Sequence, residues 1–195
     1  MPITRRTALP LLLGAGRVLS AEDWPQFRGP GGQGQSAERA LPLTWSEKEN
    51  VRWKVPIPGL GWSSPSILGD RIWITTAMDR GRSLQAICLD RETGRQVRTV
   101  EVFHSSGKEP INEKNSYASP TPLLSGEYVY LHFGPYGTAC IRNSGEIVWR
   151  TRLKYSPQHG PGGSPVLFED LLIATCQIHS FAPTGSPSFI TGGGE

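Results

Sequence analysis

The feature that most constrains the fold of this 195-residue chain is a repeat that occurs three times. Each copy begins with a Ser-Pro pair, passes through a short acidic turn and continues into a β-prone run. The prolines of these pairs are Pro65, Pro120 and Pro165, so successive copies start 55 and 45 residues apart. A repeat of this length is typical of a protein built from one supersecondary unit per copy.

Each of the first two copies contains four short runs that we expect to be strands. The last three runs are 71–75, 84–89 and 96–102 in the first copy, and 128–133, 138–141 and 147–153 in the second. A turn that contains glycine joins the last two runs of each copy, where glycine supplies the positive φ that such turns need. Four antiparallel strands with a period of about 45 residues are typical of a β-propeller blade. The sequence therefore predicts an all-β fold, a partial β-propeller of four-stranded antiparallel blades.

Two segments carry a resemblance to a known family. Ala86–Gly94 and Ala139–Trp149 resemble the pyrroloquinoline-quinone (PQQ) repeat, which reads Ala, Leu, Asp, two residues, Thr-Gly, three residues and Trp. The first copy has Arg98 at the Trp position, and the second copy lacks the Asp and the Thr. The opening Asp23–Pro30 also resembles exported propeller proteins of this family. The resemblance implies a propeller in which the Trp of each blade docks flat against the adjacent blade.

The number of repeats falls short of a closed ring, since complete propellers have about four to eight blades. Residues 50–177 supply about two and a half blades, and Asn50–Val55 resembles a fourth strand that would close a ring from the N-terminal side. The third copy stops after Cys176, and residues 178–195 are expected to be a disordered or aberrant tail. The sequence thus predicts a truncated or frame-altered propeller protein or one part of a larger one. A small irregular β-sandwich is the structural alternative.

The incomplete third copy has a consequence for association. The run at 171–175 would be an apolar strand with an open edge, and such an edge is a template for pairing with another chain. We therefore expect self-association through the open blade edges.

Residues 1–21 have the order of an export signal. An arginine pair at 5–6 is followed by an apolar run over 8–16 and by small residues at 20–21. The run is too short to span a bilayer of about 30 Å, and no later segment is long and apolar enough to do so. The sequence predicts a periplasmic or extracellular protein with no transmembrane segment, and the arginine pair resembles a twin-arginine signal. Residues 22–49 are then an extended N-terminal segment.

The charge of the chain argues against a nucleic-acid partner. The formal net charge is +3, but three arginines lie in the leader and no acid does. The rest of the chain is therefore balanced, and its basic isoelectric point belongs to the leader.

A set of polar and aromatic residues lies in the loops that lead into the innermost strand of each copy. These loops are 58–63, 112–117 and 156–163, and in a propeller they meet at one face near the central axis. They would gather Trp62, Lys114, Asn115, Tyr117 and His159 around one funnel, a combination that suits a binding mouth. Ordinary loop packing is the other interpretation.

No motif in the sequence predicts catalysis or a metal site. The histidines lack a paired spacing that zinc would need, and Cys88, Cys140 and Cys176 are expected to be buried thiols. The leading hypothesis is an exported, non-catalytic binding or scaffold module whose protein partner or small ligand the sequence does not identify. The alternative is a fragment of a quinoprotein dehydrogenase, and a third reading is a non-functional fragment.

The family resemblance implies, for its enzymes, PQQ with a calcium ion, an acidic base and often a vicinal cysteine pair. This chain has no adjacent cysteines. The residues themselves therefore predict no cofactor, and only the family resemblance suggests PQQ.

Overall fold

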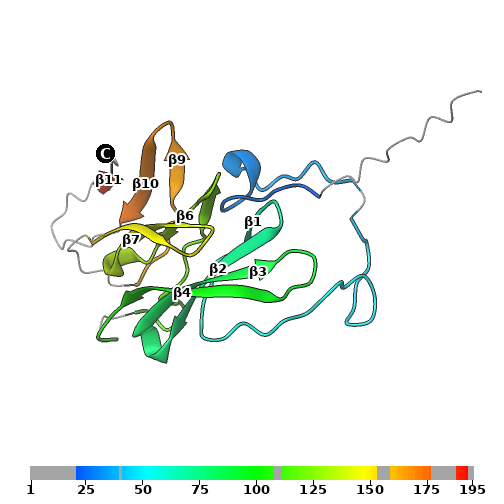
Figure 1. Cartoon of the computed structure of the whole chain (residues 1–195), viewed down its shortest axis with the longest axis horizontal. Coiled ribbons are helices and arrows are strands. Elements are labelled where there is room, and N and C mark those ends of the chain that lie inside the picture. The colour runs from blue at the N-terminus through cyan, green and yellow to red at the C-terminus, as the bar shows by residue number, and fades with distance from the viewer. Residues whose placement is uncertain (1–20, 40, 108–110, 153–158, 177–187, 193–195) are drawn as a thin grey trace, which may run out of the picture.

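The computed structural model describes residues 21–39, 41–107, 111–152, 159–176 and 188–192, with side chains as far as residue 176. Its strands form three antiparallel sheets (Figure 1). Blade 1 contains β1 (Ser66–Leu68), β2 (Arg71–Met78), β3 (Ser83–Asp90) and β4 (Gln96–His104) in that order. Blade 2 contains β5 (Leu123–Ser125), β6 (Tyr128–His132), β7 (Thr138–Arg142) and β8 (Ile147–Thr151) in that order. The third sheet has β10 (Leu171–Cys176) between β9 (Val166–Phe168) and β11 (Ser188–Gly192). The short 3-10 turns are η1 (Pro30–Gly32), η2 (Asp79–Gly81) and η3 (Gly134–Tyr136).

Blades 1 and 2 are copies of one unit. Trp73 pairs with Cys88 across β2 and β3, and Tyr130 pairs with Cys140 across β6 and β7. Each pair continues into the outer strand at the position four residues after the turn glycine, which is Arg98 in blade 1 and Trp149 in blade 2. The structure therefore confirms the predicted all-β fold with four-stranded antiparallel blades.

The main core lies between the two blades. Side chains on a strand alternate between its faces, so each blade presents one row of apolar residues to the other. Trp73 and Val102 of blade 1 are completely buried, as are Val129, Leu131 and Ile141 of blade 2, in one continuous cluster. Neither blade could bury these faces alone, as in other repeat folds where each unit contacts its neighbours.

The Ser-Pro start of each repeat joins neighbouring units at their inner strands. The Ser64 backbone N–H donates to Thr121 Oγ1 (3.0 Å), and the Thr121 N–H donates to Ser164 Oγ (3.0 Å). Ser66 Oγ is buried and donates to the Pro122 carbonyl at 2.6 Å. The repeated hydroxyls therefore satisfy backbone groups that would otherwise be left without partners between blades.

The segment Asn50–Val55 differs from the predicted closing strand, because it has no ladder of strand pairs. It covers the outer face of blade 1 instead, where Trp53 and Val55 pack against Ile72, Ile87 and Leu89. Trp53 Nε1 donates to the Arg91 carbonyl at 3.0 Å. A strand needs an open sheet edge, and the described residues around this segment offer it a sheet face.

The hairpin turns of the two blades are covered in equivalent ways. The Trp53 ring lies so close to Gly94 that a Cβ on this glycine would be 2.5 Å from the indole. In blade 2, the Arg98 guanidinium donates to the Ser144 carbonyl beside Gly145. The side chain at the repeat's Trp position thus contacts the turn of the following blade even where it is Arg.

The third sheet differs from the expected tail and open edge. Ser188–Gly192 pairs with β10 as β11, so this part of the tail is a strand, whereas 178–187 and 193–195 lie outside the described residues. β10 is hydrogen-bonded on both sides, and it is not the edge strand that the sequence suggested. The tail contains the β-prone run Phe189–Thr191, and pairing with β10 gives its backbone groups partners. Self-association through the remaining edges stays a prediction.

The segment after residue 21 runs along the inner strands of both blades. Trp24 and Ile67 exchange two backbone hydrogen bonds of 2.8 Å, and the Leu124 N–H donates to the Pro25 carbonyl at 2.8 Å. Arg91 fastens the start of this segment, since its guanidinium contacts the carbonyl oxygens of Ala21 (2.8 Å) and Glu22 (3.1 Å). The expected leader, 1–20, lies outside the described residues. Within the described ranges, no helix is long and apolar enough to cross a bilayer.

Candidate functional site

A pocket of about 390 Å³ opens between blades 1 and 2, at the end of the blades that carries η2. Three segments form it: the loop that leads into β1, the η2 turn between β2 and β3, and the loop that leads into β5. The residues that line it are Leu60, Gly61, Trp62, Ala77, Arg80, Gly81, Ile111, Asn112, Glu113, Asn115, Ser116 and Tyr117. Its walls are mainly aliphatic and aromatic, with a few polar groups, which is the usual composition of a binding pocket.

The loop that leads into β1 is held against the end of β2. Leu60 and Ala77 exchange two backbone hydrogen bonds of 3.0 and 2.9 Å, and Thr76 Oγ1 donates to the Pro58 carbonyl at 2.6 Å. Gly59 has φ +82°, and a Cβ there would be 2.5 Å from Thr76 Oγ1. The close approach therefore requires glycine, and it holds the loop that carries Trp62 against the end of β2.

The η2 turn brings Arg80 to the pocket through a strained backbone. Asp79 (φ 49°) and Arg80 (φ 58°) both lie in the left-handed region, which costs a residue other than glycine about 1 to 3 kcal/mol. Gly81 follows with φ +83°, and a Cβ there would be 2.6 Å from the Tyr117 ring. Ser105, the residue directly after β4, donates from its Oγ to the Gly81 carbonyl at 2.7 Å and so supports the turn.

Tyr117 and Trp62 come from different blades and are held together by backbone contacts. The Ala118 carbonyl, next to Tyr117, accepts hydrogen bonds from Trp62 N (3.1 Å) and Ser63 N (3.2 Å). The Tyr117 ring meets the Tyr136 ring of η3 edge to face, with centroids 5.8 Å apart. The backbone of the aromatic wall is thus anchored on both blades, and the Tyr117 ring is packed against Tyr136.

The structure brings Trp62, Asn115 and Tyr117, three of the five predicted site residues, to this pocket. Lys114 and His159 are exposed and are not among its lining residues. A role for each of the five in binding stays a prediction.

Asn115 has its side-chain amide occupied. Its Nδ2 donates to the carbonyls of His159 (2.6 Å) and Pro161 (3.1 Å), and its Oδ1 accepts from Ser119 Oγ (2.5 Å). Asn115 therefore ties the loop before β5 to the loop before β9, and it positions the site rather than offering a free amide.

Sequence reasoning missed Arg80, Leu60 and Ile111. The signal for Arg80 was present in the turn Asp79–Gly81, because the connection between the second and third strands of a blade lies at the same end as the loop into the first strand. Leu60 sits two residues before Trp62 and is 74% exposed, while Trp62 is 66% exposed.

The side chains with the largest pKa shifts are inside the blades and are not among the pocket residues. Burial raises the pKa of the Cys88 and Cys140 thiols to about 11 and lowers the pKa of His132 to about 4. His132 is almost fully buried, with Nδ1 2.8 Å from Thr138 Oγ1. Among the described residues, no three His, Cys, Asp or Glu side chains group in a way that could hold a metal ion.

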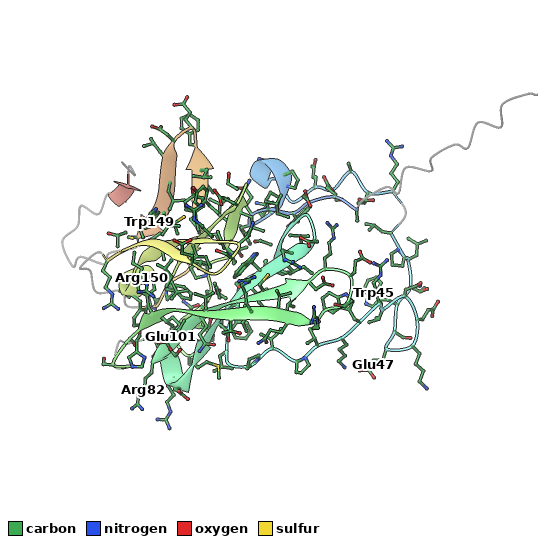
Figure 2. The ribbon with its side chains drawn as sticks, viewed as in Figure 1. Trp45, Glu47, Arg82, Glu101, Trp149 and Arg150 are labelled. Carbon is green, nitrogen blue, oxygen red and sulfur yellow. The ribbon has the colours of Figure 1, made fainter. Side chains whose placement is uncertain are left out.

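A second hollow, of about 460 Å³, lies between the outer strands β4 and β8. Its two arginines bind the backbone of the other blade, since Arg150 donates to the Glu101 carbonyl (3.3 Å) and Arg152 to the His104 carbonyl (3.1 Å). Figure 2 labels Arg150 and Glu101 on facing strands. The guanidinium of Arg152 also lies over the Phe103 ring, 5.5 Å from its centroid. These side chains join the blades, so we place the candidate site in the first pocket.

No protein-family model matches the sequence, and no curated protein matches it. The chain is similar to part of two solved structures. For BamB from Moraxella catarrhalis the sequence identity is 18% and the TM-score 0.44, and the match covers 63% of this chain and 33% of that one. For a europium-containing methanol dehydrogenase the identity is 10% and the TM-score 0.42, with 57% and 19% covered. The chain thus matches a third or less of the length of either protein.

Proposed function

We propose that this chain belongs to a non-catalytic propeller module that binds a protein partner at the pocket between blades 1 and 2. The observation that carries the proposal is the convergence of Trp62, Tyr117 and Arg80 on one pocket. Trp, Tyr and Arg are the residue types that dominate the binding energy of protein interfaces. Leu60 and Trp62 also expose large apolar surfaces beside the pocket, which a protein partner would cover and a small ligand would leave in water.

The pocket is better suited to binding than to acid–base chemistry. Catalytic groups are commonly found where burial and neighbouring charges shift a pKa inside a cleft. The strongly shifted groups Cys88, Cys140 and His132 are packed inside the blades and do not line this pocket.

The alternative, a fragment of a quinoprotein dehydrogenase, finds less support in these residues. Cys88 and Cys140 lie in different sheets and are both buried, so they do not form the vicinal pair that the PQQ-like resemblance implies. The described residues also lack a cluster that could hold the calcium ion. The described residues thus offer neither of these two features, which favours the binding module over the enzyme. Titration with PQQ and Ca²⁺, followed by absorbance, should show no saturable complex, and a stoichiometric complex that oxidises alcohols would favour the enzyme.

Site-specific photocrosslinking in the producing cell tests the partner. A photoreactive side chain at position 60 should give a discrete protein adduct, because Leu60 stands at the rim of the pocket. The matched control is position 148, since Val148 is also apolar and exposed but lies on the outer strand β8. An adduct at 148 alone, or at neither position, would contradict the proposed function.

We also propose that the protein is exported. The support is the basic, apolar and small-residue order of 1–21. Cleavage is expected between Ser20 and Glu22, and mass spectrometry of protein recovered from outside the cytoplasm measures it. Recovery with the leader intact would contradict this localisation mechanism.

A further inference from the structure

A third hollow, of about 370 Å³, shares Arg80 with the pocket between blades 1 and 2. This third hollow is lined by Asp79, Arg80, Arg82, Ser106 and Gly107. Its character differs from that of the first, because two guanidinium groups replace the aromatic and aliphatic walls. The two hollows therefore form an apolar subsite and a basic subsite on either side of one arginine.

The guanidinium groups of Arg80 and Arg82 are exposed, and neither makes a side-chain hydrogen bond or ion pair within the described part of the chain. Other arginines of the blades do have such partners. Arg71 Nη1 lies 3.5 Å from Asp90 Oδ2, and Arg142 Nη1 lies 2.8 Å from Glu127 Oε2. Figure 2 shows Arg82 projecting from the margin of the molecule. Among its described lining residues the basic subsite has two cations and one carboxylate, that of Asp79, while Glu113 lines the adjoining pocket. This excess of positive charge at the basic subsite favours a negatively charged group in the ligand.

The apolar subsite indicates which second group the ligand carries besides the negative charge. Its volume of about 390 Å³ is at the small end of the range for ligand pockets, and Ile111, Ala77 and Tyr117 form an apolar lining. One large apolar side chain would fill much of this space. Leu60 and Trp62 continue the apolar surface beyond the pocket, which indicates a ligand longer than one side chain.

From this arrangement we infer that the partner of the proposed function presents an extended acidic–apolar peptide segment. One aromatic or aliphatic side chain enters the pocket beside Tyr117, and a carboxylate within two residues of it binds Arg80 and Arg82. The inference rests on the proposed function, and it adds the chemistry of the segment that is recognised.

Panning of a displayed random-peptide library on the full chain tests the inference. We expect enriched peptides that combine an apolar residue with Asp or Glu one or two positions away. Trp62→Ala should weaken their binding about tenfold or more, as for truncation of an interface hot spot. Arg80→Glu should abolish the acidic preference and enrich Lys or Arg instead.

A matched charge reversal controls for the change in net charge. Arg95→Glu alters another exposed arginine, in the β3–β4 turn at the opposite end of blade 1 from η2, and it should leave binding unchanged. Thermal unfolding of each variant shows that the fold persists.

The outcomes separate this inference from the proposed function. Peptides that depend on Trp62 but ignore Arg80→Glu and carry no acid would overturn the charge requirement and leave a protein-binding pocket. A library without any Trp62-dependent peptide would overturn both. Acidic peptides that Arg95→Glu weakens as much as Arg80→Glu does would also overturn the inference, because the attraction would then come from the overall charge.

Discussion

The interface between blades 1 and 2 buries the aromatic ring of blade 1 completely, whereas the equivalent face of blade 2 leaves its two aromatic rings half-buried. The two faces are built from the same row of positions: Trp73, Cys88 and Arg98 in blade 1, and Tyr130, Cys140 and Trp149 in blade 2. Trp73 and Cys88 are completely buried. Tyr130 and Trp149 are half-buried, with ring centroids 6.4 Å apart, on the side of blade 2 where β9 and β10 lie (Figure 1).

This difference indicates how a complete neighbouring blade buries the face that it covers. Blade 2 offers blade 1 a four-stranded sheet, and its Ser144–Gly145 turn reaches Arg98 at the outer end of the row. The third sheet contains β9, β10 and β11, and in the described residues no turn reaches Trp149. At the interface of blades 1 and 2, the hairpin turn of blade 2 therefore covers the outer end of the row.

Burial at the interface of blades 1 and 2 also leaves two side-chain nitrogen atoms without hydrogen bonds among the described residues. Trp73 Nε1 and Arg98 Nε are buried and have no hydrogen-bond partner among the described residues. An unpaired buried polar atom costs about 1 to 3 kcal/mol, so apolar contact has to offset this at the closed interface.

The largest effect is expected at Trp73. Trp73→Ala should lower the free energy of unfolding by about 3 to 5 kcal/mol, because it opens a cavity in the fully buried core. Tyr130→Ala, at the equivalent half-buried position, should cost about 1 to 2 kcal/mol. Urea titration followed by circular dichroism measures both, and equal losses would contradict the difference between the interfaces. Trp73→Phe should cost less than Trp73→Ala, since it keeps a ring and removes the unpaired N–H.

Acid should destabilise the interface of blade 2 and the third sheet through His132. Burial holds the pKa of His132 near 4, below its ordinary 6.5, so the folded protein binds this proton less readily than the unfolded chain. Stability is then fully present above about pH 6.5 and is lost as the pH falls toward 4, by about 3 kcal/mol in total. The equivalent position in blade 1 is Thr75, which does not titrate. Urea unfolding of wild type and His132→Asn across this range checks the effect, and an unchanged pH dependence in the variant would assign it to other groups.

The two hairpin turns should tolerate a methyl group differently. Gly94→Ala combines φ +69° with a Cβ position 2.5 Å from the rigid Trp53 ring, and about 2 kcal/mol of stability should be lost. Gly145→Ala meets flexible atoms at 3.2 Å or more, on Val100 and Arg98, and about 1 kcal/mol is expected. Thermal unfolding gives the ranking. A larger loss at Gly145 would show that Trp53 moves aside more easily than Arg98.

The last prediction concerns thiol reactivity and not stability. Burial raises the pKa of the Cys88 and Cys140 thiols to about 11, against an ordinary 9.0, so the folded protein holds fewer thiolates near neutral pH and alkylation of both should be slow. Cys140 should still react first, because opening of the third sheet uncovers it and opening of blade 1 from blade 2 is needed for Cys88. Mass spectrometry after timed exposure to iodoacetamide distinguishes the two thiols, and earlier labelling of Cys88 would reverse the proposed order of opening.

The features that could be predicted from the sequence are those that depend on residues close together along the chain. Strands and glycine turns follow from local patterns, so both blades and the convergence of Trp62, Asn115 and Tyr117 could be foreseen. The position of Trp53 on the Arg91–Gly94 turn could not, because that contact joins residues about 40 positions apart and replaces a strand pairing that the pattern favoured equally. Arg80 was missed for a related reason. A hairpin turn looks polar and ordinary in sequence, and its role appears only when the loops of two blades meet.

The contact of Arg91 with the start of the described chain has a consequence for the timing of maturation. Its guanidinium holds the carbonyls of Ala21 and Glu22 at the place where the leader is expected to be cut. A peptidase needs that backbone extended and accessible, so cleavage competes with the docking of this segment onto blade 1. Arg91→Ala should therefore shorten the lifetime of the uncleaved precursor in a pulse–chase experiment, and an unchanged lifetime would mean that the leader is removed before blade 1 forms.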